Sequence, residues 1–187
     1  MGRINQLALA GGVVCVALLG ACANAAVQTG AAATGTADVT QALRERPITV
    51  LVELPPSVAD VIATLGTSQR DDAITVRLTI EGVSAAGESS GLRVFVGRTA
   101  GEPSNDSPAY VGSVSFGHSG PFEAQPTDSF LLNIAPALRR LPEDQRLTGP
   151  RRATLPITLA PRTPPPSERS GAITIKRLAV SVHRADR

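Results

Sequence analysis

The chain has 187 residues, of which 42% are hydrophobic, 3% aromatic and 18% charged, and its formal net charge is +2 at pH 7. The small charge and the lack of a concentrated block of lysine and arginine argue against a nucleic-acid-binding track. The few aromatic residues also leave little surface for stacking bases or sugars. The length suits one domain with a packed core.

The first 26 residues have the features of an export signal. Arg3 lies near the start, an apolar stretch runs from about Leu7 to Leu19, and small residues follow it. This apolar stretch is too short for a stable transmembrane helix. We therefore set it apart from the folded domain.

The stretch Leu19-Gly20-Ala21-Cys22 resembles the bacterial lipobox, where cleavage leaves the cysteine as the first residue for acylation. We expect residues 1–21 to be a lipoprotein signal peptide and Cys22 to carry fatty acids that anchor the chain to a membrane of the bacterial cell envelope. The alternative is an ordinary secreted protein cut near Ala23 to Ala26. With Cys15 in the signal and Cys22 lipidated, the mature domain has no thiol for a disulfide, a zinc site or a nucleophile.

Residues 22–46 are predicted to be the lipidated cysteine and a flexible tether. The sequence "VQTGAAATGTADVT", from Val27 to Thr40, is small and polar and has no periodicity. A short helical turn around Val39 to Arg46 is the one regular element we allow for. The folded domain is expected over residues 47–187.

Beyond Pro47, apolar residues alternate with polar ones, which is typical of half-buried strands. In "ITVRLTIEG", for example, Ile74, Val76 and Leu78 fall on one face. The strands predicted in this way lie near residues 48–54, 74–81, 92–97, 110–116, 130–134, 155–160 and 172–182. Seven strands with almost no helix predict an all-β fold, an antiparallel sandwich or a jelly-roll-like barrel.

Two local features qualify this pattern. In the last strand the apolar phase set by Ile173 and Ile175 is lost at Leu178, and a β-bulge at Lys176-Arg177 would return the later apolar residues to the core. The sequence "APALRRL" predicts a helical turn, with Pro136 at an N-terminal position where a missing amide hydrogen costs nothing.

The chain is poor in groups for catalysis. His118 and His183 are the only histidines and Met1 is the only methionine, which is too few for a copper pair, a three-histidine zinc site or a thioether copper carrier. The carboxylate pairs Asp71-Asp72 and Glu143-Asp144 lie in predicted loops, as solvated turns do. The serine-containing stretches "GESSG" and "GHSG" lack the strand-to-helix elbow of a nucleophile. We expect no enzyme activity, no metal and no cofactor.

Six segments suggest a relationship. They are, in chain order between Ile74 and Val182, "LTIEGV", "GLRVFVGR", "YVGSVSFGH", "FLLNIAPALRRL", "PITLAPR" and "AITIKRLAVSV". This order resembles the C-terminal domain of plant-type polyphenol oxidases and related bacterial tyrosinases, which is named after a Lys-Phe-Asp-Val motif. The best segments are Tyr110 to His118 and Thr158 to Arg162. The namesake motif reads Gly91-Leu92-Arg93-Val94 here, so its lysine and aspartate are gone.

The resemblance implies a function between chains. In that family the C-terminal domain packs over the copper site of its own chain and restrains the enzyme until the domain is removed. The present sequence does not contain the catalytic domain with its six copper-binding histidines. The implied function is a non-catalytic, membrane-anchored module that docks on a tyrosinase-like copper oxidase of a separate chain and shields or regulates it. A structural or adhesive envelope module with no oxidase partner is the alternative, and help in copper delivery through a shared histidine site is a third.

Three residues are the candidates for contact with a partner. Phe122, at the tip of "GHSGPFEAQ", is the candidate plug, and its alternative is a loop residue folded back on the core. His118 follows the predicted strand, where capping of the turn is the alternative to metal or proton chemistry. Tyr110 begins the same strand. Arg162, in "LAPRTPPP", is expected to brace a loop.

Overall fold

The computed structural model describes residues 33–44, 46–67, 73–85, 91–98, 102–115, 128–162 and 172–184. The strands are β1 (Thr34–Asp38), β2 (Ile48–Glu53), β3 (Ile74–Ala85), β4 (Gly91–Val96), β5 (Tyr110–Ser115), β6 (Asp128–Asn133), β7 (Thr154–Pro161), β8 (Ile173–Thr174) and β9 (Arg177–Arg184). The helices are α1 (Pro56–Thr64), α2 (Ala135–Arg140) and α3 (Glu143–Arg146), followed by a 3₁₀ turn, η2 (Pro150–Arg152).

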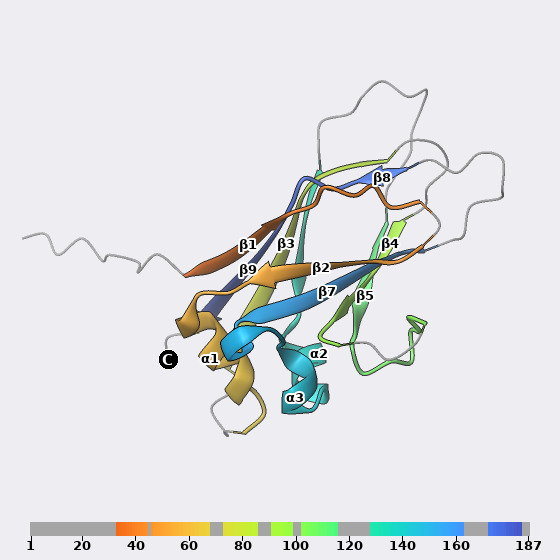
Figure 1. Cartoon of the computed structure of the whole chain (residues 1–187). Helices are drawn as coiled ribbons and strands as arrows, with labels where there is room; N and C mark the ends of the chain where they lie inside the picture. Colours follow the sequence, from red (N-terminus) through yellow and green to blue (C-terminus); the bar gives the residue numbers. More distant parts are fainter. Residues whose placement is uncertain are drawn as a thin grey trace, which may run out of the picture. The chain divides into compact units, whose positions relative to one another are not determined.

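All nine described strands belong to one antiparallel sheet, in the order β5-β4-β7-β2-β1-β9-β3-β6, with β8 paired to β3. Figure 1 shows that this sheet curls and that the helices gather at one end of it. The predicted all-β antiparallel fold is confirmed. The described strands outnumber the predicted ones because β1 was not foreseen and the last predicted strand divides into β8 and β9.

The predicted tether is wrong over its later part, because residues 34–38 form β1. This strand pairs along its length with β9 and meets β2 at Thr36 and Glu53. The helical turn allowed for around Val39 to Arg46 is also wrong, since Leu43 there is fully buried and forms a bridge with Ile173. Glycine makes the close packing of β1 possible: a Cβ atom on Gly35 would lie 2.5 Å from the carbonyl oxygen of Glu53.

The core lies inside the curl and is closed at one end by α1 and α2. Pro56 occupies the first turn of α1, where its missing amide hydrogen is not needed. Val58, Ile62 and Leu65 follow at helical spacing and are buried against the sheet. Burying each such side chain contributes about 1.5–3 kcal/mol, so helix formation and core closure support each other. α2 contains Pro136 in its first turn, as predicted.

The apolar phase does change in the last strand, since Ile175 and Leu178 are both buried, but the predicted β-bulge at Lys176-Arg177 is wrong. Glu81 pairs with Arg177 and Ser84 pairs with Thr174, so β3 keeps the same register on both sides of the interruption. β3 changes phase at Gly82, whose φ is +66°, and its register with β6 shifts there. The bulge therefore lies in β3 relative to β6, and β3 bends together with the last strand.

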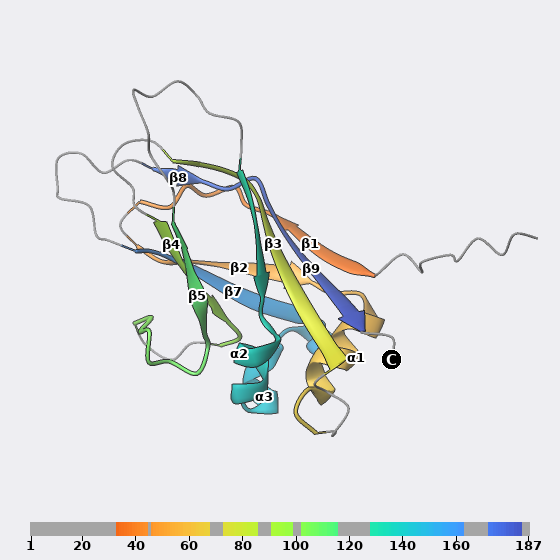
Figure 2. The ribbon, with the colours of Figure 1, turned by 180° about the vertical axis from the view of Figure 1, so that it is seen from behind.

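The sheet has two unlike ends. At the end that carries α1–α3, here called the helical end, the chain enters at Thr34 and β9 finishes at Arg184. At the other end, called the loop end, Gly91 pairs with Ser115 and Ser84 with Thr174. Figures 1 and 2 both show β8 at this end, far from the helices. None of the described helices is long and apolar enough to cross a bilayer.

The close packing at the loop end can be tested by substituting Gly91. Its φ of +152° disfavours other residues, and an added Cβ would lie 2.1 Å from the carbonyl oxygen of Val114. We expect Gly91→Ala to lower the free energy of unfolding by about 2 kcal/mol or more, measured by urea denaturation. The matched control is Gly112→Ala in the paired strand, where no atom lies within 4 Å of the added Cβ. Equal stability of the two variants would show that the close approach at Gly91 is not required.

Candidate partner-docking site

Of the three residues predicted to contact a partner, Tyr110 is the one that lies in the described part of the structure. Tyr110 opens β5, whereas Cys22, His118 and Phe122 lie outside the described residues. The stretch that contains His118 and Phe122 begins after Ser115, at the end of β5, and finishes before Asp128, at the start of β6. β5 and β6 are the two edges of the sheet, so this stretch joins one edge to the other.

Tyr110 packs on the outer surface of the sheet. Its ring centre lies 5.4 Å from that of Phe95, with the two ring planes at 49°. Its hydroxyl group forms a 2.8 Å hydrogen bond with the Ser113 hydroxyl, and its carbonyl accepts a 2.7 Å bond from Arg140. Phe95 is fully buried and Tyr110 half-buried, so the tyrosine covers the phenylalanine and presents its polar tip to solvent.

A register shift aims Tyr110 at Phe95. Val94 pairs with Gly112, but Phe95 pairs with Tyr110, which leaves Val111 as an extra residue in β5. Such a bulge turns the edge strand and redirects a side chain. The placement of Tyr110 is thus a property of the sheet edge, which supports a structural role and leaves its predicted contact with a partner as a prediction.

Arg162 braces the loop end, as the sequence predicted. Its guanidinium group donates a 2.6 Å hydrogen bond to the Ser115 hydroxyl, and its amide donates a 2.9 Å bond to the Gly91 carbonyl. These two bonds join the ends of β7, β5 and β4. They fix the point at which the stretch with His118 and Phe122 leaves the sheet.

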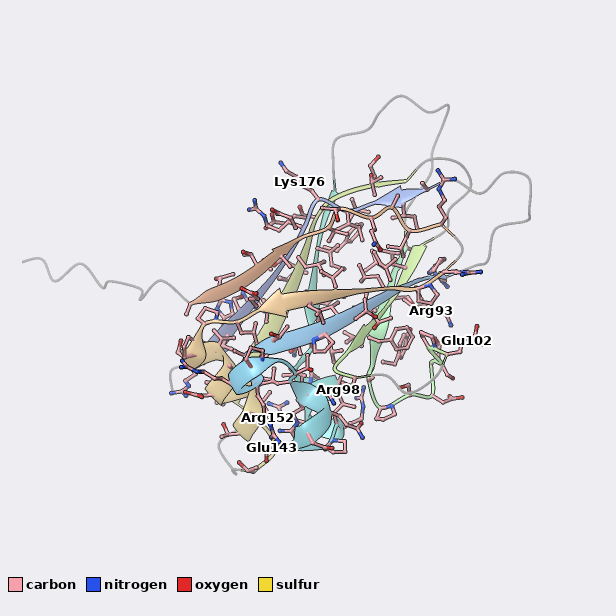
Figure 3. The ribbon with its side chains drawn as sticks, in the orientation of Figure 1. Arg93, Arg98, Glu102, Glu143, Arg152 and Lys176 are labelled. Atoms are coloured by element: carbon pink, nitrogen blue, oxygen red, sulfur yellow. The ribbon has the colours of Figure 1, made fainter. Side chains whose placement is uncertain are left out.

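The stretch Gly91-Leu92-Arg93-Val94, at the position of the family motif, lies in the buried strand β4. Leu92 and Val94 are fully buried, while Arg93 is half-buried and donates a 3.5 Å hydrogen bond to the carbonyl of Pro103. Its Nε atom is buried without a hydrogen bond to the described residues. Figure 3 shows Arg93 on the same side of the sheet as Glu102, in the segment before β5. Arg93 therefore helps to hold this segment over β4.

Groups suited to chemistry are dispersed among the described residues. No set of three histidine, cysteine, aspartate or glutamate residues within them is placed to hold a metal ion. His183 lies on β9, where its Nε2 atom is 3.0 Å from the Ser181 hydroxyl. Glu143 and Asp144 are exposed in the first turn of α3 rather than in a loop, and Glu143 pairs with Arg152 at 3.0 Å. Asp71 and Asp72 lie outside the described residues.

A shallow depression of about 170 Å³ lies between the end of β1 and the start of β2. Its lining residues are Asp38, Val39, Thr40, Gln41, Ile48, Thr49 and Val50. Pockets for drug-sized ligands usually enclose roughly 300–1,000 Å³. Asp38, the charged group in the lining, is engaged by Arg177 at 3.3 Å. This depression is therefore a poor candidate for a small-molecule site.

Sequence reasoning missed the arginine residues of the helical end. Arg146 is 6% exposed and donates hydrogen bonds of 3.0 Å to the Leu141 carbonyl and 3.1 Å to the Ala63 carbonyl, and another to the Leu65 carbonyl. It thereby ties α3 to the last turn of α1. The signal was available in the sequence, because five arginines fall between Arg139 and Arg152 against two carboxylates.

Comparison with known proteins finds similar solved structures but no matching sequence family. No protein-family model and no curated protein sequence matches the chain. Among solved structures, latent aurone synthase, a polyphenol oxidase, is similar at a TM-score of 0.49 and 16% identity over 80% of this chain. Latent apple tyrosinase is similar at a TM-score of 0.48 and 17% identity over 76% of this chain. The chain spans 27% of the length of each of these proteins. These two similar structures are a polyphenol oxidase and a tyrosinase.

Tyr110 can be tested by two substitutions. Tyr110→Ala removes the ring contact with Phe95 and should lower the free energy of unfolding by about 1–2 kcal/mol, less than for a fully buried aromatic residue. Tyr110→Phe keeps the ring and should change stability by less than about 0.5 kcal/mol, because the lost hydrogen bond is exposed. Urea denaturation measures both. Wild-type stability of Tyr110→Ala would contradict the structural role.

Proposed function

We propose that this chain is a non-catalytic, lipid-anchored module of the bacterial cell envelope that docks on a tyrosinase-like copper oxidase of a separate chain and shields or regulates it. The observation that carries the proposal is the order of the six sequence segments that resemble the C-terminal domain of polyphenol oxidases. In the folded chain these segments supply β3, β4, β5, β6 with α2, β7 and β8–β9. The resemblance therefore covers most of the sheet.

A shield works by excluding substrate and water from a cleft, which requires a surface held in a fixed position. The loop end meets this requirement at its base. Arg162 joins the ends of three strands there, and the bridge between Leu43 and Ile173 is buried at the same end of the sheet. Phe122 and His118 lie in the stretch that leaves this base, so they are the residues proposed to enter the partner's cleft.

In this proposal the copper-dependent oxidation takes place on the partner, not on this chain. Two histidines and one methionine are too few to build a conventional copper centre from this chain alone. Binding through a shape-complementary surface needs no such centre. An aromatic side chain in a desolvated pocket is a common source of interface affinity. Phe122 has the chemistry for that contact.

The docking proposal is tested by pulling down the tagged, full-length protein from gently solubilised membranes of the producing cell. We expect recovery of a histidine-rich copper protein whose phenol oxidase activity rises when this chain is stripped from it. Mass spectrometry and an oxidation assay provide the two readouts. Recovery of envelope components without an oxidase would instead favour a structural or adhesive module.

Phe122→Ala identifies the contact within that complex. The concentration of the variant needed for half-maximal inhibition of the recovered oxidase should be at least about tenfold higher than that of the wild type. Loss of a central aromatic contact commonly has an effect of this size. Leu131→Ala is the matched control, because Leu131 is 60% exposed on β6 and lies outside the proposed contact. Unchanged inhibition by Phe122→Ala would remove this residue from the docking site.

The lipid anchor is tested separately by labelling cells with a radioactive fatty acid. The wild-type chain should incorporate the label and sediment with membranes, and Cys22→Ala should do neither. Cys15→Ala is the control, because that cysteine lies in the predicted signal and should leave labelling unchanged. An unlabelled wild-type chain, or a Cys22→Ala chain that keeps both label and membrane association, would overturn the anchor.

A further inference from the structure

No further inference is drawn: the strongest candidate, the opening between β1 and β2 beyond the pairing of Thr36 with Glu53, where the half-buried side chains of Ile48 and Val50 line the depression of about 170 Å³, carries none, because nothing in the structure shows what covers it.

Discussion

The pairing of β1 between β2 and β9 is the constraint on which the rest of the sheet depends. Without β1, the order of strands would break into β5-β4-β7-β2 on one side and β9-β3-β6 on the other. Five residues with small side chains thus join the two halves, and Gly35 lets the backbone approach Glu53 closely. The curl of the sheet and the closed core both follow from this connection.

The two ends of the joined sheet are each held together by one arginine residue. Arg146 ties α3 to α1, so the helices form a firm cover over the core at one end. Arg162 ties three strand ends together at the other. In both cases a guanidinium group bonds to backbone or hydroxyl oxygens of neighbouring elements.

The sequence predicted those elements whose side chains alternate. β2, β3 and β7 were recognisable because apolar residues recur at every second position, and burial of one face follows from that pattern. β1 was not recognisable, because "TGTAD" has no apolar alternation and is extended only because β9 and β2 supply its hydrogen bonds. α1 was missed although Pro56, Val58 and Ile62 carried a helical signal. The geometry of the candidate site could not be predicted in this way. The bulge that directs Tyr110 toward Phe95 depends on pairing between strands, which no local sequence pattern encodes.

The position of β1 also has a mechanical consequence. The proposed lipid anchor at Cys22 would pull on the chain ahead of Thr34, the first residue of a strand inside the sheet. The pull along β1 would act as a shearing load shared by its hydrogen bonds to β9, rather than opening them one at a time from an edge. Forces from the membrane, or from a partner moving at the loop end, would thus pass through the joint between the two halves of the sheet. The strand that makes the sheet continuous would then also be the strand that carries this load.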